Sequence, residues 1–244
     1  MIVLKLGGSV ITEKASPETI DEAALRTAAD VLSGVGDIVL VHGGGSFGHP
    51  AAERHGLTRT DGSHDHEAII EIHEAMRRLN QRVIDALHEV AVPALPVHPL
   101  SLASRDDDGA LTLPMPSIVR MLEQGFVPVL HGDVIIHVGK GATILSGDEL
   151  VVELADGLRA DRVGLCSSVP GVLDESGAVI DRIDAVETVA AHLGESDATD
   201  VTGGMAAKVT ALLDLEAPAV VFGPDDLPAF LGGESPGTLI GARR

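Results

Sequence analysis

The sequence has one cysteine, four phenylalanines and neither tryptophan nor tyrosine in 244 residues. The single cysteine, Cys166, cannot form an internal disulfide, and its place in an apolar, strand-like run favours a buried thiol over a nucleophile. No apolar run reaches the roughly 18 residues that a membrane-spanning helix needs, and residues 1–6 lead into glycines without a signal-peptide cleavage site. We therefore expect a cytoplasmic protein that does not bind membranes.

Positive charge is scarce as well. Lysine and arginine number 17 against 37 aspartates and glutamates, for a formal net charge of -20 at pH 7. Such a surface repels nucleic acid, which excludes a polynucleotide as the expected substrate. The acidic excess favours adaptation to high salt over an ordinary acidic protein. Only four lysines are present, and three of them lie in glycine-rich motifs, which predicts functional roles for those three.

Short apolar runs alternate with helical periodicity along the whole chain. Residues 2–6 and 37–41 are aliphatic runs that end in glycines and indicate buried strands, whereas residues 66–90 repeat apolar side chains at helical spacing. Further strands are predicted at 94–97, 127–130, 162–166 and 219–222, a hairpin at 134–137 and 142–145, and helices at 19–32, 117–123, 148–158, 185–192, 204–215 and 225–230. The pattern predicts one α/β domain, residues 1–244: a three-layer α/β/α sandwich around a mainly parallel sheet, with ligands at the carboxyl ends of its strands.

Two glycine-rich motifs directly follow predicted strands. In Lys5-Leu6-Gly7-Gly8-Ser9, glycines without Cβ would let backbone N–H groups approach a phosphate, although a tight structural turn accounts equally well for them. In residues 42–49, H-G-G-G-S-F-G-H, three successive glycines exceed what a turn requires and suggest backbone donors beside a ligand. His49 is a candidate hydrogen-bond donor to a phosphate, whereas His42 is better explained as a core or turn histidine.

Two later motifs place charged side chains at predicted helix starts. Asp148 in Ser146-Gly147-Asp148 is either an ordinary first-turn carboxylate or the charge that orients nearby lysines. In residues 200–208, D-V-T-G-G-M-A-A-K, Lys208 lies one turn past Gly204, and a helix N-terminus with an ammonium group beside it forms an anion site.

Two other polar motifs carry less information. His131-Gly132-Asp133 ends a predicted strand, and a structural turn explains it as well as or better than a site. Residues 105–109, R-D-D-D-G, read as a solvated turn rather than as metal ligands. We therefore predict no metal bound directly by the protein.

Taken in order, K-L-G-G-S, H-G-G-G-S-F-G-H, H-G-D, S-G-D and D-V-T-G-G-M-x-x-K resemble the amino-acid kinase superfamily, most closely its branch that uses isopentenyl phosphate as acceptor. The ordered set is specific and covers the chain from Lys5 to Lys208. The resemblance implies ATP-dependent phosphorylation of isopentenyl phosphate to isopentenyl diphosphate, with ATP and Mg²⁺. It also implies an acceptor-binding lobe at about 1–145, a nucleotide-binding lobe at about 146–244, and a homodimer.

The resemblance implies individual roles too. Lys5 and Lys208 would contact the transferred group, Lys14 would stabilise the transition state, and Asp148 would hold the lysines in place. The nucleotide would be bound by Lys5, Gly7, Gly8, Ser9, Gly45, Ser168, Gly204 and Lys208, and the acceptor phosphate by Gly44, His49 and Gly147. Ile72, Met76 and Leu79 are candidates for a wall along the acceptor's apolar tail, although core packing is the better explanation for each.

One departure and several alternatives accompany this resemblance. Where the family commonly has T-D-V-D-G-V, residues 167–172 read S-S-V-P-G-V, so at Ser168 only a hydroxyl can contact the nucleotide. The acceptor could instead be a carboxylate, carbamate, a nucleoside monophosphate or a phosphonate, or the chain could be a non-catalytic nucleotide-binding protein on the same fold. The S-F-G-H extension with His49 argues against a carboxylate acceptor, and retention of Lys5, Lys14 and Lys208 argues against loss of catalysis.

Overall fold

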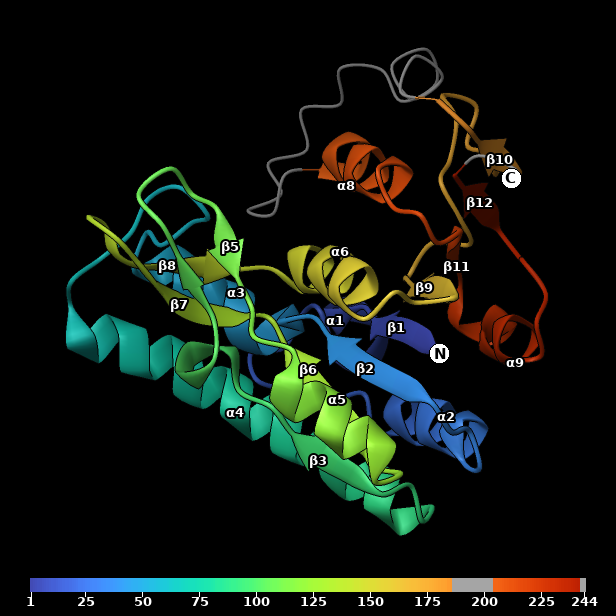
Figure 1. Ribbon diagram of the computed structural model, residues 1–244, viewed down its shortest axis with the longest axis horizontal. Helices are drawn as coiled ribbons and strands as arrows, with labels where there is room; N and C mark the ends of the chain where they lie inside the picture. The colour runs from blue at the N-terminus through green and yellow to red at the C-terminus, as the bar shows by residue number, and fades with distance from the viewer. Residues whose placement is uncertain (186–203, 242–244) are drawn as a thin grey trace.

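The computed structural model describes residues 1–185 and 204–241, arranged around one large sheet (Figure 1). All neighbouring strands of this sheet are parallel except the β11–β12 pair. Its strand order is β10 (Arg182–Ile183), β12 (Thr238–Ile240), β11 (Ala219–Phe222), β9 (Arg162–Cys166), β1 (Ile2–Leu6), β2 (Ile38–His42), β6 (Val127–His131) and β3 (Ala94–Pro96). Strands from residues 1–131 therefore form one side of the sheet, and strands from residues 162–240 form the other.

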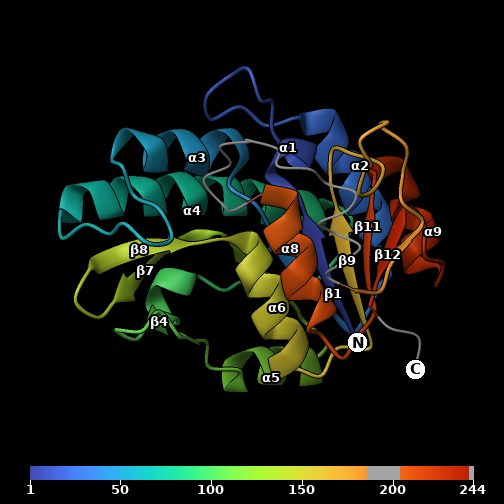
Figure 2. The same ribbon diagram turned by 90° about the horizontal axis from the view of Figure 1, so that it is seen from above.

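Helices cover both faces of the sheet (Figure 2). One face carries α1 (Gly8–Ile11), α2 (Glu22–Leu32), α3 (Gly45–Arg54), α4 (His66–Glu89) and α9 (Leu227–Leu231), and the other carries α5 (Pro116–Glu123), α6 (Gly147–Gly157) and α8 (Gly204–Leu213). Side chains alternate between the two layers: in β1, Leu4 and Leu6 belong to the first apolar core and Val3 to the second. The predicted three-layer α/β/α fold is confirmed.

A smaller sheet lies beside the sandwich. Its order is β5 (Leu111–Thr112), β4 (Ser104–Arg105), β7 (Asp133–His137) and β8 (Gly141–Leu145). The β7–β8 pair is the predicted antiparallel hairpin, and a third apolar core joins it to α3 and α4 through Val134, Ala52 and Ile72. A turn at Asp106–Ala110 connects β4 to β5. A short 3₁₀ helix, η1 (Pro99–Ser101), precedes β4.

Most predicted elements are present, and the differences have local causes. The helix predicted at 19–32 begins at Glu22, because Asp21 caps it by accepting a hydrogen bond from the N–H of Ala24 at 3.0 Å. The helix predicted at 225–230 is a 3₁₀ turn, η2 (Pro224–Asp226), followed by α9. The helix predicted at 185–192 lies, apart from its first residue, outside the described residues. None of the described helices is long and apolar enough to cross a bilayer.

Candidate active site

A cavity of about 470 Å³ opens at the carboxyl ends of the central strands. Its lining includes the first residue after each of four strands: Gly7 after β1, Gly43 after β2, Gly132 after β6 and Ser167 after β9. Strand β1 pairs with β2 on one side and with β9 on the other. The connection from β1 to β2 runs through α2 on one face of the sheet, whereas α6, which leads into β9, covers the other face. The cavity thus occupies the switch point at which α/β sheets bind ligands.

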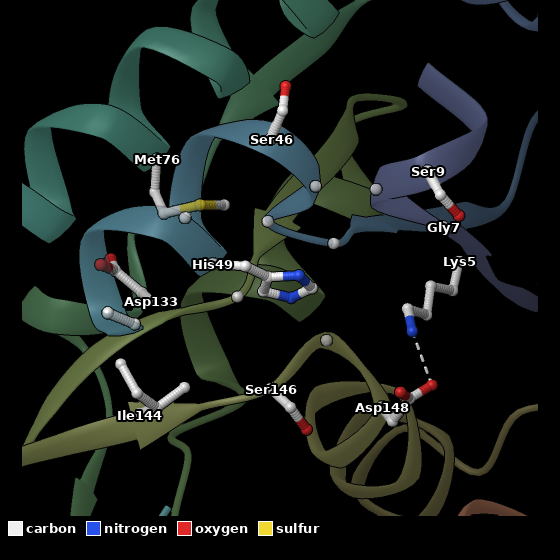
Figure 3. A pocket seen from close by; sticks show the side chains of 18 of the residues that line it. Lys5, Gly7, Ser9, Ser46, His49, Met76, Asp133, Ile144, Ser146 and Asp148 are labelled. Atoms are coloured by element: carbon white, nitrogen blue, oxygen red, sulfur yellow. Dashed lines mark hydrogen bonds and ion pairs between the residues drawn. The ribbon is translucent and has the colours of Figure 1, made fainter. Parts of the chain in front are cut away.

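One carboxylate holds two lysines at this cavity. Lys5 Nζ lies 2.6 Å from Asp148 Oδ1, and Lys208 Nζ lies 3.4 Å from Asp148 Oδ2 (Figure 3 draws the first pair). Burial acts to raise the pKa of Asp148, but the charges of Lys5 and then Lys208 outweigh it, so the pKa lies below its ordinary value. Asp148 is therefore ionised at neutral pH and fixes both ammonium groups at the rim of the cavity.

The start of α6 positions Asp148. Ser146 is the N-cap, and it forms a complete capping box with Glu149, so Asp148 is not the cap but a first-turn residue that remains available to the lysines. Gly147 leaves room for the Lys5 side chain, because a Cβ there would lie 3.2 Å from Lys5 Cε and 3.4 Å from the His42 carbonyl oxygen.

The first two glycine motifs pack backbone against backbone. A Cβ on Gly8 would lie 2.2 Å from the nitrogen of Gly45, and one on Gly43 would lie 2.7 Å from the nitrogen of Gly8. Gly45 also has a φ of 48°, in the left-handed region that favours glycine. Within the described chain the N–H groups of Gly8, Gly44 and Gly45 have no hydrogen-bond acceptor. These residues line the cavity, so the glycines serve loop packing and leave donors for an anion.

Two buried histidines lie behind these loops. His42 and His131, the last residues of β2 and β6, are 0% exposed, and their ring centroids are 5.5 Å apart in a stacked arrangement. Burial lowers the pKa of His42 to about 4 and that of His131 well below its ordinary value. Both rings are therefore neutral at pH 7. This confirms the interpretation of His42 as a core histidine.

A neutral His42 also sets the direction of the peptide that follows Gly43. Its Nδ1–H donates to the Gly43 carbonyl at 3.2 Å, and because C=O and N–H of a trans peptide point in opposite directions, the N–H of Gly44 points away from the ring. The other ring nitrogen, Nε2, is then an acceptor, and it lies 3.1 Å from the side-chain position assigned to the Asn80 oxygen Oδ1. Exchanging the oxygen and nitrogen positions of the Asn80 amide places Nδ2 against the His42 Nε2 acceptor. Nδ2 is a buried donor that otherwise has no partner among the described residues, so we assign the amide in this orientation.

His49 separates two ends of the cavity. Its ring projects between Met76 and Ile144 on one side and the Lys5–Asp148 pair on the other (Figure 3). His49 belongs to α3, so the second half of its motif is helical. Gly48 allows α3 to approach α4, because a Cβ there would lie 2.6 Å from Met76 Sδ.

The three predicted tail-wall residues divide into two groups. Ile72 and Met76 line the cavity, one helical turn apart on α4, and Ile144 of β8 lines it as well. Leu79 is 0% exposed and does not line the cavity, so core packing is its role.

Lys14 and Lys140 show that glycines beside a lysine were a poor guide to which lysines lie at the cavity. Lys14 is exposed and lines the cavity although no glycine-rich stretch surrounds it. Lys140, between Gly139 and Gly141, is instead a hairpin-turn residue whose Nζ donates to the Thr60 carbonyl at 2.9 Å. Glycines around Lys140 therefore indicate a turn and not a site.

Ser9, Ser168 and Gly204 were predicted to contact the nucleotide. Ser9 lines the cavity and donates a hydrogen bond to the exposed Ser168 at 3.2 Å. Gly204 is the first residue of α8, whereas Asp200 to Gly203 lie outside the described residues. Cys166 is buried, as predicted, and burial raises the pKa of its thiol to about 12, which disfavours the reactive thiolate form.

Comparison with known proteins agrees with this arrangement. Residues 1–220 match the model of the amino acid kinase family. The chain belongs to the amino acid kinase family. It is 61% identical to the isopentenyl phosphate kinase of Haloferax volcanii, with 98% of each chain covered, and 34% identical to that of Methanocaldococcus jannaschii, again with 98% of each covered. A crystal structure of isopentenyl phosphate kinase superposes with a TM-score of 0.84 at 27% identity, covering 98% of this chain and 99% of that one.

Family membership confirms the resemblance predicted from the ordered motifs. Several cavity-lining residues of this amino acid kinase were not assigned roles from sequence, among them Ser46, Asp133 and Ile144. Ser46 lies inside the H-G-G-G-S-F-G-H motif, which was a usable signal. Ile144 is one of several aliphatic residues in a short strand and had no distinguishing pattern.

Proposed function

We propose that this chain transfers the terminal phosphoryl group of ATP to isopentenyl phosphate, forming ADP and isopentenyl diphosphate. One observation carries the proposal: in a protein of net charge -20, a single cavity gathers Lys5, Lys14 and Lys208 with glycine N–H groups that have no acceptor in the described chain. Concentrated positive charge in so acidic a protein is suited to a small, multiply charged anion.

The nucleotide phosphates would lie at the Gly8 and Gly45 end, with Lys5 and Lys208 on the transferred group. Because Asp148 already fixes both ammonium groups, the enzyme would not need to reorganise them as charge moves onto the transferred phosphoryl group. Lys14 would approach the same group from the opposite loop and stabilise it in the transition state. Ser9 and Ser168 would border the nucleotide through hydroxyl groups.

The chemistry requires no general base. The acceptor oxygen of isopentenyl phosphate is already ionised near neutral pH, so the P–O bond to ADP breaks and a P–O bond to that oxygen forms without a proton transfer. Among the described residues no group of three or more His, Cys, Asp or Glu side chains could hold a metal. Mg²⁺ would therefore enter on the nucleotide phosphates, where it neutralises part of their charge.

The acceptor side would be formed by α3, α4 and the start of α6. Gly44 and Gly147 would offer backbone N–H groups to the acceptor phosphate, and His49 would add a side-chain donor beside them. Ile72, Met76 and Ile144 would then contact the isopentenyl tail at the apolar end of the cavity.

An acceptor panel tests this proposal. ATP consumption by the purified protein is measured with isopentenyl phosphate, an N-acylated glutamate, carbamate, a nucleoside monophosphate and a small phosphonate. Isopentenyl phosphate should give the highest kcat/KM by at least about tenfold, since it alone supplies both a phosphate and a branched apolar tail. A higher kcat/KM with a carboxylate acceptor would contradict the assignment of the acceptor site.

The finer expectations remain part of the proposal. They are a homodimer, a cytoplasmic location, adaptation to high salt, and the division into an acceptor lobe at about 1–145 and a nucleotide lobe at about 146–244. Light scattering in molar KCl tests the dimer, and the melting experiment in the Discussion tests the salt dependence.

A further inference from the structure

Ser46 connects two parts of the proposed catalytic machinery. It is the second residue of α3, between Gly44 and His49, and it is 7% exposed. All of its hydrogen-bonding groups contact the segment that carries Lys14. Its N–H donates to Thr12 Oγ1 at 3.0 Å, and its carbonyl accepts from the N–H of Glu18 at 3.0 Å. Its hydroxyl lies 3.3 Å from the Thr19 carbonyl, to which it donates, and 3.4 Å from the Thr19 N–H, from which it accepts.

Pro50 makes the carbonyl of Ser46 available. In an uninterrupted α-helix that carbonyl would accept from the N–H of residue 50, but proline has no N–H to donate. Glu18 supplies the missing donor from outside the helix. The proline inside α3 therefore exchanges one helical hydrogen bond for a bond to the Lys14 segment.

Glu18 is held in a conformation that the chain would not favour alone. Its φ is 49°, in the left-handed region that non-glycine residues seldom adopt, and such residues persist only where their surroundings hold them. Here the backbone N–H is bound by Ser46, and the carboxylate is bound by Arg78 of α4, whose Nη2 lies 2.8 Å from it. A bridge between Thr12 and Ile20 closes the base of the loop.

We propose that Ser46, together with Pro50, is a positioning residue that holds the 13–19 loop so that Lys14 faces the acceptor-binding end of α3. The inference rests on the proposed role of Lys14. It has a mechanistic consequence: the turn that offers Gly44 and His49 to the acceptor also fixes the lysine that stabilises the transferred group. Acceptor position and Lys14 position are thus set by one element.

A double-mutant cycle tests the proposal. Ser46→Ala removes both side-chain bonds to Thr19 but keeps the two main-chain bonds, so kcat should fall about tenfold while the KM for ATP stays within about twofold. In a Lys14→Ala background the same substitution should lower kcat no further, because the group that Ser46 positions is absent. An equal loss in both backgrounds would show a general structural role and overturn the inference.

Pro50→Ala provides a second variant, for which the expected loss of kcat cannot be explained by a loss of stability. Alanine favours the helix and supplies the N–H that can recapture the Ser46 carbonyl, so kcat should fall at least about threefold while the melting temperature does not drop. An unchanged kcat would contradict the role given to Pro50. Here too the loss should vanish in the Lys14→Ala background.

Ser33→Ala is the matched control. Its hydroxyl also joins two elements, donating to the Val90 carbonyl at 3.1 Å, but it does not line the cavity, so kcat should not change. Different results would overturn the proposed function and the role of Ser46. A wild-type protein that does not phosphorylate isopentenyl phosphate would remove the proposed function, whereas an active wild type with additive Ser46 and Lys14 effects would remove this inference only.

Discussion

Replacing Asp148 with asparagine tests how the cavity keeps its lysines in place. The substitution preserves size and removes the charge that lies 2.6 Å from Lys5 Nζ and 3.4 Å from Lys208 Nζ. At an effective dielectric constant of ~20 these attractions are worth about 6 and about 5 kcal/mol before desolvation is counted. Removing one member of a buried pair has a net cost of about 3–5 kcal/mol. Because the three side chains are 12–23% exposed, we expect about 3 kcal/mol of lost stability.

The same variant should lower kcat by roughly 10²-fold, since two ammonium groups lose their common anchor and are no longer preorganised for the transferred group. The KM for ATP should not rise, because the cavity gains one unit of positive charge. Urea unfolding and steady-state kinetics measure both effects, with Asp30→Asn, at an exposed position of α2, as a control of equal charge change. Wild-type kcat in Asp148→Asn, or a loss confined to the KM for ATP, would refute the anchoring role.

Four further outcomes are expected. Lys14→Ala should lower kcat by about 10²- to 10³-fold with ATP affinity nearly intact, as measured by calorimetry and kinetics; a rise in the KM for ATP alone would contradict the assigned role. His49→Ala should lower kcat/KM for isopentenyl phosphate by about 10- to 150-fold without affecting ATP, and His49→Gln, which keeps a donor but cannot carry the charge, should fall between; wild-type efficiency of the alanine variant would refute the assignment. The melting temperature should rise by several degrees from dilute buffer to molar KCl because the net charge is -20, and equal values would refute salt adaptation. The pKa of His42 falls from 6.5 to about 4 on folding, so the contribution of neutral His42 to the free energy of unfolding is complete above pH 6.5 and is lost as the pH falls toward 4. At about 1.4 kcal/mol per pH unit the loss is about 3 kcal/mol. A urea midpoint unchanged between pH 7 and pH 4 would contradict this.

Most strand positions followed directly from the sequence because the runs are short, aliphatic and bounded by glycine or polar residues, although β10 and β12 of the large sheet were not predicted. β1, β9 and β11 have the predicted boundaries, and α4 ends within one residue of its predicted end. The small sheet was only half predicted. β4 and β5 are two residues each, which is too short for alternation to be visible.

Helix α3 shows why local propensity failed at the site. Glycines at 45 and 48 and a proline at 50 all disfavour a helix. The helix forms because Gly45 adopts a positive φ, Gly48 fits against Met76, and the carbonyl left free by Pro50 finds a partner in Glu18. The contacts of Gly48 with Met76 and of the Ser46 carbonyl with Glu18 join α3 to segments distant in sequence, so a window of local sequence could not predict them.

The site was predicted by residue type but not by geometry. Lys5 and Asp148 are 143 positions apart, and their contact depends on where α6 begins beside β1. The motifs identified both residues as candidates, yet the choice between a helix-start carboxylate and a lysine anchor stayed open. In the structure Ser146 caps α6, and Asp148 is left to bind the lysines.

Phosphorus NMR of the wild-type protein with ATP and isopentenyl phosphate tests the central claim most directly. We predict that the monophosphate resonance is replaced by the two resonances of a diphosphate, in step with the formation of ADP. Formation of ADP while the isopentenyl phosphate resonance persists, or phosphorylation of another acceptor from the panel in preference to it, would contradict the claim.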